Sequence, residues 1–410
     1  MPLLTNISLL ATCRAEGGQG DIHLIPDAVL VWEGGTIQWV GRRGELPAGY
    51  RGAESVDAQG ALVVPGLVDC HTHLAFAGWR ADEFAQRLGG RSYLDIARDG
   101  GGIAKTVRLT RAASEPELVA RAARFLAEMR ALGVTTVECK SGYGLDRENE
   151  LKLLRVYRAL AGSQPVRLVP TFLGAHTVPA ELRGDRERYI ALLVDELIPE
   201  VGAARLASFC DVFVESGAFT VHEARRILTA GKAAGLGPKL HADQLTAGGG
   251  AELAAEMGAV SADHLECASD AGIAAMARAG VVAVSLPLAS LYLGQPPMPA
   301  RKFIEAGVPV AVATDFNPGS APSYHLPVAL TLACTLQRMT PAEALKGATI
   351  HAARAIGLER RVGSLEAGKA ADFILVDAAD VDEWLYHLRP NACRATAIAG
   401  SLAPASRGTP

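Results

Sequence analysis

Two histidines separated by a single residue, His71 and His73, follow an apolar run near the start of the chain. Side chains alternate along an extended strand, so both imidazoles leave the same face and can reach one metal ion. Alone this spacing is a weak signal, but His241, His264 and Asp315 also follow apolar runs. Imidazole and carboxylate ligands suit a divalent ion such as zinc or iron. We therefore predict that His71, His73, His241 and Asp315 hold one catalytic divalent metal.

The elements that must position these residues are short apolar runs that alternate with helical stretches. Amphipathic segments such as 117–132 and 150–161 predict the helices. Nearly continuous apolar strands alternating with helices indicate a parallel sheet that is covered on its faces. The eight predicted strands are 67–70, 135–139, 167–172, 211–214, 238–241, 262–264, 281–286 and 308–314.

Eight such units predict a closed (β/α)8 TIM barrel. Polar residues lie at or just beyond the carboxyl ends of most of the runs, and in this fold that end carries the active site. A doubly wound open sheet is a weaker alternative, because its ligands bind at one crevice rather than at the ends of many strands.

Both ends of the chain predict a second, smaller unit. Residues 28–32, 36–40, 371–376 and 395–398 form strand-like runs without helical periodicity. We expect the two ends to complete one β-sandwich domain made of residues 1–62 and 357–410, with the catalytic barrel at 63–356.

Composition excludes several classes of protein. The chain has 410 residues, 49% hydrophobic and 20% charged, and a net charge of -4 without a basic stripe. It is therefore expected to fold and not to bind nucleic acid. No apolar run approaches the roughly 20 residues of a membrane span, and the first residues do not resemble an export signal. Seven cysteines without a C-x-x-C pair predict reduced thiols and a cytoplasmic protein.

The metal-site motifs resemble those of the amidohydrolase superfamily, with PGLVDCHTHL on the first strand, histidines on the fifth and sixth, and aspartate on the eighth. Within it, the chain is similar to the imidazolonepropionase family of histidine degradation. The stretches that carry this resemblance are HTHLAFAGWR, GGGIAKTV, ECKSGYGLD, FLGAHTVP, HADQLTAGGGAELA and ATDFNPGSAP.

The resemblance implies a reaction and a set of site residues. The reaction is the opening of the ring of 4-imidazolone-5-propanoate by water, which gives N-formimidoyl-L-glutamate and uses one zinc or iron ion. The planar guanidinium of Arg80 can bind the propanoate tail through two hydrogen bonds. The other substrate contacts implied by the family are Tyr143, His176, Gln244, Asn317, Gly319 and Ser320.

In the expected mechanism, the metal lowers the pKa of water toward about 7. Asp315 accepts a proton from the attacking water and returns it to the leaving ring nitrogen. His264 stabilises the developing oxyanion or orients the water. Some relatives carry glutamate where this chain has Gln244, and a neutral amide cannot serve as a base.

Binuclear relatives bridge two metals with a modified lysine after the fourth strand. This strand reads DVFVES and has no lysine, whereas Lys140 follows the second strand, so one metal is expected. Glu215 is a candidate hydrogen-bond partner for a metal-binding histidine. The histidines away from strand ends are expected to be structural, and His325 is the first of them to reconsider.

Two other functions stay open at this point. The same metal site could serve a cyclic amidohydrolase or aminohydrolase that acts on a hydantoin, pyrimidine or guanine. A carboxylate clamp at Arg80 favours the imidazolone instead. The barrel could also be an inactive scaffold, but a scaffold has no use for so many buried polar groups. The family resemblance further implies a homodimer.

Overall fold

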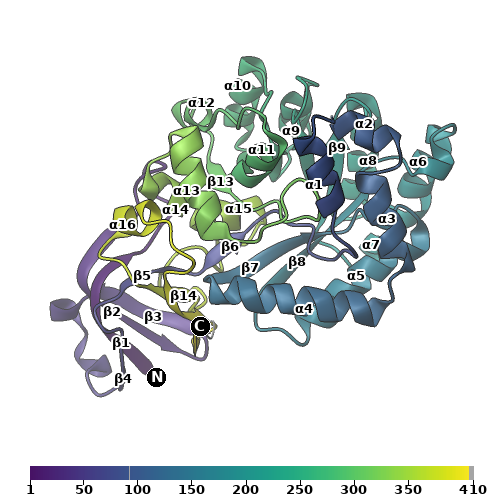
Figure 1. Ribbon diagram of the computed structural model, residues 1–410. Coiled ribbons are helices and arrows are strands. Elements are labelled where there is room, and N and C mark those ends of the chain that lie inside the picture. The colour runs from purple at the N-terminus through teal and green to yellow at the C-terminus, as the bar shows by residue number, and fades with distance from the viewer. Residues whose placement is uncertain (92, 406–410) are drawn as a thin grey trace.

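A computed structural model describes residues 1–91 and 93–405 and confirms the predicted TIM barrel. Eight parallel strands follow one another in chain order around the barrel (Figure 1). The strands are β6 (Leu67–Asp69), β7 (Val134–Lys140), β8 (Arg167–Ala175), β9 (Phe209–Val214), β10 (Gly237–Ala242), β11 (Ser261–His264), β12 (Val282–Ser285) and β13 (Val310–Val312).

The barrel closes just beyond the ends of its first and last strands. Thr72 and Phe316 form a parallel bridge there. On either side of it, the Asp315 amide donates to the His71 carbonyl at 3.1 Å and the His73 amide donates to the Phe316 carbonyl at 2.8 Å. The closure thus joins the segments that carry three of the four predicted metal ligands.

Helices surround the barrel, and several begin at a side-chain cap. Ser114 and Glu117 form a reciprocal capping box at the start of α4, and Thr220 with Glu223 does the same for α8. The helices are α1 (Ala81–Leu88), α2 (Tyr93–Arg98), α3 (Ile103–Ala112), α4 (Glu115–Ala131), α5 (Arg147–Ala161), α6 (Arg186–Ala191), α7 (Ile198–Ala203), α8 (Val221–Ala233), α9 (Gly250–Met257), α10 (Asp270–Ala279), α11 (Pro287–Leu293), α12 (Ala300–Glu305), α13 (Leu326–Gln337), α14 (Pro341–Lys346), α15 (Ala352–Ala355) and α16 (Val381–Tyr386).

A second sheet combines both ends of the chain, as predicted. In Figure 1 its purple N-terminal and yellow C-terminal strands lie side by side. It has its own apolar core, separate from the barrel core. Its strands are β1 (Pro2–Ala11), β2 (Leu24–Glu33), β3 (Thr36–Arg42), β4 (Glu54–Asp57), β5 (Leu62–Pro65), β14 (Phe373–Val376), β15 (Cys393–Ile398) and β16 (Ser401–Pro404).

Polar contacts join this sheet to the barrel. The Arg167 guanidinium on β8 lies 2.7 Å from the Asp372 carboxylate, and the Gly66 amide donates to the Asp372 carbonyl at 2.9 Å. Asp372 is buried, so this ion pair fixes β14 against the edge where β5 leads into the barrel.

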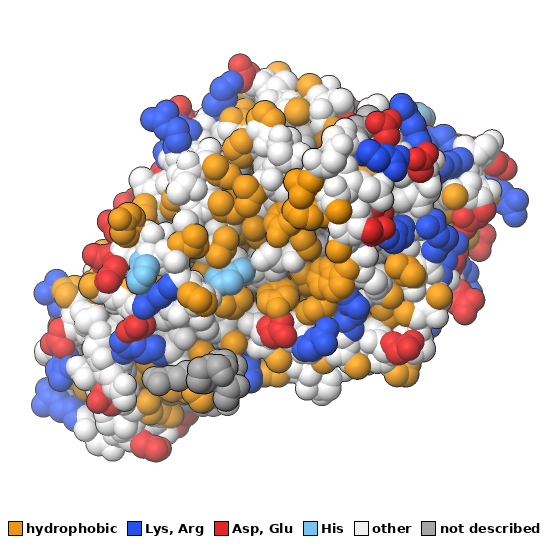
Figure 2. Space-filling model, viewed as in Figure 1, with side chains coloured by type: hydrophobic (Ala, Val, Ile, Leu, Met, Phe, Trp, Pro, Cys, Tyr) orange, Lys and Arg blue, Asp and Glu red, His pale blue; other side chains and the backbone are white. Residues whose placement is uncertain are grey.

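On the surface, cationic and anionic side chains are interspersed on the face that Figure 2 shows, with apolar side chains between them. This view agrees with the absence of a basic stripe in the sequence. Among the described helices, none combines the length and apolarity that a bilayer crossing requires.

Candidate active site

The predicted metal ligands converge at the carboxyl end of the barrel. The Oδ1 atom of Asp315 lies 3.4 Å from His71 Nε2 and 3.5 Å from His73 Nε2. His241 Nε2 lies 3.5 Å from His73 Nε2. His264 is beside them, and its ligating nitrogen lies within 4.8 Å of those of His71 and His241. All five side chains are buried.

Two carboxylates orient the imidazoles from behind. Asp263 bonds His71 Nδ1 at 2.6 Å, and Asp211 bonds His241 Nδ1 at 3.0 Å. Each bond places the proton on Nδ1 and leaves Nε2 facing the other ligands, which is the usual arrangement behind a metal-binding histidine. His71 Nε2 is buried without a hydrogen-bond partner among the described residues. A divalent ion fits this set of donors.

The backbone adopts left-handed conformations where two of these side chains emerge. The φ angle is 80° at His264 and 53° at Asp315. Residues other than glycine rarely adopt such angles, and they cluster at functional sites where the surrounding structure holds them. The closing contacts of the barrel supply that restraint at Asp315.

A buried lysine lies beneath the metal-ligand cluster. Lys140 Nζ is 2.7 Å from Asp211, 2.8 Å from Glu138 and 3.4 Å from Asp263. All four side chains are fully buried, so the charges are shielded from water and interact strongly. Two of these carboxylates are the ones that orient His71 and His241. Lys140 therefore neutralises and positions the groups that hold the ligands.

Burial and neighbouring charges shift the pKa values of this cluster. Burial lowers the pKa of Lys140, but Asp211, Glu138 and Asp263 outweigh burial and raise that pKa above the ordinary lysine value. Burial raises the pKa of Asp315, but the neighbouring imidazoles of His71 and His73 outweigh burial and hold the pKa well below the usual range. The Asp315 side chain is therefore a carboxylate at neutral pH.

A cavity of about 350 Å³ opens above this cluster. The volume is typical of a small-molecule site. Phe213 and Ile103 contribute apolar surface to its wall. The predicted residues that line it are His73, Arg80, Tyr143, His176, His241, Gln244, His264, Asp315, Asn317 and Ser320.

Aromatic contacts fix the polar wall of this cavity. The His176 ring stacks on the His73 ring with centroids 5.1 Å apart, and its Nδ1 lies 3.0 Å from the Gly142 carbonyl. The Tyr143 ring is 5.6 Å from that of His73 and is almost fully buried. Burial, followed by His73 and His241, holds the pKa of His176 well below its usual value, so its imidazole is neutral.

Arg80 and residues of the loop 317–320 form another part of the wall. Arg80 is 4% exposed, and its amide donates to the Pro318 carbonyl at 3.1 Å. A Cβ atom at position 319 would overlap the Arg80 guanidinium. Gly319 is not among the described residues that line the cavity. It leaves the space that the guanidinium occupies.

The side-chain amide of Asn317 makes most of its hydrogen bonds within this loop. Its Oδ1 accepts from the Gly319 and Ser320 amides, each at 2.8 Å, and its Nδ2 donates to the Asp315 carbonyl at 2.7 Å. The side chain thus joins the loop to the backbone of Asp315, a predicted metal ligand. Sequence reasoning expected this donor and acceptor to face the substrate.

Glu215 does not bond any of the predicted metal-binding histidines. Its carboxylate accepts from the backbone amides of Leu245 and Thr246 at 2.8 and 3.2 Å. It therefore holds the loop that follows β10 and carries Gln244. The role expected of Glu215 belongs instead to Asp211 and Asp263, which bond His241 and His71 and which the sequence did not single out. A sequence signal existed, because ionised residues in otherwise apolar strands need a buried partner.

His325, the first of the remaining histidines to reconsider as a functional residue, has a structural role instead. Its Nδ1 accepts from the Val328 amide at the start of α13, and its Nε2 lies 2.8 Å from the Pro390 carbonyl. It thus ties a helix start to the C-terminal segment.

Comparison with known sequences places this geometry in a family. A sequence model described as the Amidohydrolase family matches residues 62–403. An imidazolonepropionase from Myxococcus xanthus is 51% identical over 381 residues, which are 92% of this chain and 90% of that protein. One from Anaeromyxobacter dehalogenans is 50% identical over 396 residues, 95% of this chain and 93% of the relative. One from Geobacillus kaustophilus is 49% identical over 375 residues, 90% and 88% of the two chains.

Solved structures with lower sequence identity share the fold. A 5-methylcytosine deaminase from Klebsiella pneumoniae has a TM-score of 0.74 at 17% identity, covering 98% of this chain and 96% of that one. An adenosine deaminase from Xanthomonas campestris, solved with bound zinc, has a TM-score of 0.71 at 20% identity and covers 98% and 92% of the two chains. With half of its residues shared with three imidazolonepropionases over about nine-tenths of its length, this chain belongs to the amidohydrolase family.

Proposed function

We propose that this protein is an imidazolonepropionase, a hydrolase that opens the ring of 4-imidazolone-5-propanoate to give N-formimidoyl-L-glutamate in histidine degradation. The observation that carries the proposal is that one cavity contains both the histidine–aspartate cluster and the buried Arg80. The first provides for hydrolysis of a cyclic amide, and the second selects a substrate with a carboxylate.

One divalent metal, zinc or iron, would be held by His71, His73, His241 and Asp315. A bound ion of this kind polarises a carbonyl and lowers the pKa of water toward about 7. The chain holds the ligands ready, because Asp263 and Asp211 fix two of the imidazoles in the required orientation.

Asp315 is the proposed proton carrier. Its carboxylate accepts a proton from the water that attacks the ring carbonyl and returns it to the ring nitrogen as the carbon–nitrogen bond breaks. His264 lies in the same wall and donates a hydrogen bond to the oxygen that gains negative charge. The Glu266 carboxylate lies 3.6 Å from His264 Nδ1, beyond hydrogen-bond distance. Gln244 hydrogen-bonds the substrate ring and takes no proton.

The remaining wall residues orient the substrate. Arg80 binds the propanoate tail, and Tyr143 and His176 contact the ring. Ser320 lies in the cavity wall, whereas Asn317 and Gly319 act mainly by shaping the place of Arg80. Holding both ends of a small substrate reduces the entropy lost on reaching the transition state.

The test is turnover by metal-replete protein of a panel of ring compounds. The panel contains 4-imidazolone-5-propanoate, hydantoin, dihydrouracil and guanine. We expect ring opening of the first compound only, and an Arg80→Ala variant that loses activity chiefly through a higher KM. Preference for a compound without a carboxylate would replace this assignment with another cyclic amidohydrolase. Inactivity toward all of them by metal-loaded protein would support the scaffold alternative.

Three finer features belong to the same proposal. The metal is zinc or iron, since imidazole and carboxylate accept both. The protein works as a homodimer in the cytoplasm, as its resemblance to this metabolic family implies. Metal analysis of protein purified from its native host and light scattering of the purified enzyme test the first two features. Cell fractionation tests the third.

A further inference from the structure

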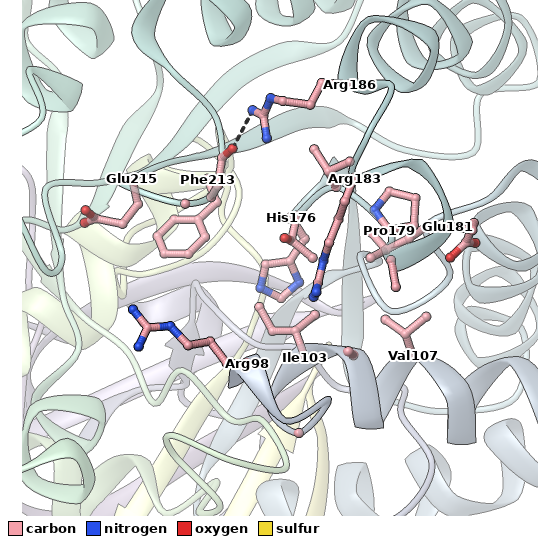
Figure 3. Close-up of a pocket in the computed structure, with 18 of the residues that line it drawn as sticks. Arg98, Ile103, Val107, His176, Pro179, Glu181, Arg183, Arg186, Phe213 and Glu215 are labelled. Atoms are coloured by element: carbon pink, nitrogen blue, oxygen red, sulfur yellow. Dashed lines mark hydrogen bonds between the residues drawn. The ribbon is translucent and has the colours of Figure 1, made fainter. Parts of the chain in front are cut away.

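A second, larger cavity adjoins the catalytic one. It has a volume of about 490 Å³ and lies between the start of α3 and the segments that follow β8 and β9. Its wall includes Ile103, His176, Phe213 and Leu245, and these four residues also line the catalytic cavity. Figure 3 shows His176 among the residues around this space. The two cavities therefore share one wall.

Arginine dominates the charged lining of this second cavity. Five arginines and two glutamates contribute to its wall. Both carboxylates are already engaged. Glu181 accepts from Arg111 at 2.7 Å, and Glu215 accepts backbone amides of the loop after β10. They therefore do not neutralise the remaining cationic side chains.

Three of the arginines are left with little or no compensating charge. The Arg183 guanidinium has no hydrogen-bond or ion-pair partner in the described part of the chain. Arg108 donates to a backbone carbonyl, that of Gly100, at 2.9 Å. Arg98 meets Asp95 at 3.4 Å in an exposed pair, which contributes little binding energy in water. Figure 3 shows Arg98, Arg183 and His176 around the same space.

The rest of the wall is apolar. Val107, Val178 and Pro179 contribute to it. A cavity with a cationic rim and an apolar floor suits a small molecule that has a carboxylate on a short methylene chain. A carboxylate on a methylene chain is also what the substrate of the proposed reaction carries.

We propose that this arginine-lined chamber is a second binding site, specific for small carboxylate anions. The substrate binds there first and then moves past the four shared residues into the catalytic cavity. The chamber raises the local concentration of the anion beside the catalytic cavity, as clefts lined by charge of one sign do. The identity of the anion as substrate rests on the proposed function, whereas anion binding itself does not.

The kinetic test uses the double variant Arg98→Gln/Arg183→Gln and a matched control, Arg278→Gln/Arg360→Gln. The control removes the same charge from exposed arginines that do not line either cavity. At about 10 mM ionic strength, the chamber variant is expected to lose about fivefold in kcat/KM with an unchanged kcat. At about 0.5 M salt the difference should shrink to less than about twofold. Equal kcat/KM in both variants at low salt would overturn the proposal.

A binding test separates the chamber from the reaction. Glutarate, a five-carbon dicarboxylate, is titrated calorimetrically into Arg80→Ala protein, which lacks the catalytic clamp. We expect glutarate binding that is lost when Arg98→Gln and Arg183→Gln are added but kept with the control pair. Glutarate binding that is unchanged by these two substitutions contradicts the chamber as a binding site, even if turnover is normal. Binding through them in an enzyme that fails to open the imidazolone retains the chamber and removes only the proposed function.

Discussion

The Arg80 guanidinium occupies the space that a Cβ atom at residue 319 would need. Position 319 therefore requires glycine for the sake of a neighbouring side chain. The helix α1 that begins after Arg80 is tied to the same loop, because Arg87 Nη2 donates to the Gly319 carbonyl at 3.3 Å. Arg80, the proposed carboxylate clamp, and the loop after Asp315 thus form one unit.

A Gly319→Ala variant should displace Arg80 and weaken substrate binding. We expect KM to rise about tenfold, the scale of a lost charge-assisted hydrogen bond, while kcat changes less. Steady-state kinetics measure this, with Gly184→Ala as the control because a Cβ there meets nothing within 4 Å. In an Arg80→Ala background, Gly319→Ala should add little, since both changes remove the same interaction. Fully additive effects would show that Gly319 acts independently of Arg80.

Replacing Lys140 with methionine should weaken metal binding in a protein that still folds. The change leaves Asp211, Asp263 and Glu138 buried without their shared cation, and two of them orient the imidazoles of proposed metal ligands. We expect the dissociation constant for zinc, measured by competition with a chromophoric chelator, to rise about 10- to 100-fold.

The control for this variant is Lys152→Met. Lys152 donates to three backbone carbonyls, those of Thr110, Arg111 and Ala113, away from the metal ligands. Its loss should lower the melting temperature without changing zinc affinity. If folded Lys140→Met protein bound zinc as tightly as wild type, Lys140 would have no positioning role.

The dependence of stability on pH should include a contribution from His351. Burial, followed by Lys346 and Arg354, lowers the pKa of His351 to about 3. Because the unfolded chain takes up a proton near pH 6.5 and the folded one does not, the free energy of unfolding falls as pH drops from about 6.5 toward 3. His351→Gln removes this loss, so between pH 7 and pH 5.5 the variant should lose about 1 kcal/mol less than wild type.

Urea unfolding at a series of pH values measures the effect. His222→Gln is the control, since His222 is exposed on α8. A His351→Gln curve that parallels both wild type and control would contradict the assignment.

Local patterns predicted the fold and brought the candidate metal ligands together because their determinants are short-range. The apolar runs predicted all eight barrel strands, and the polar residues after them lie at the carboxyl end of the barrel. The pattern His71-x-His73 needs only strand alternation to place two imidazoles together. His241, His264 and Asp315 then follow from the geometry of the barrel, which brings all strand ends into one ring.

The supporting residues could not be predicted in the same way. The pairings of Asp263 with His71 and of Lys140 with Asp211 join strands far apart in sequence. No local rule selects which buried charge meets which. Glu215 shows the same limit, because its position at a strand end is equally compatible with a histidine partner and with the loop amides that it holds. The space for Arg80 beside Gly319 depends on side-chain packing that the sequence does not display.

The most direct test of the central claim is a metal titration of turnover. The enzyme is stripped with a chelator, zinc or iron is added in measured equivalents, and hydrolysis of 4-imidazolone-5-propanoate is followed by its ultraviolet absorbance. We predict no activity in the stripped protein, a linear rise to a plateau at about one equivalent per chain, and no recovery in a His73→Ala variant. Full activity without metal, or a plateau at two equivalents, would contradict a single catalytic metal held by His71, His73, His241 and Asp315.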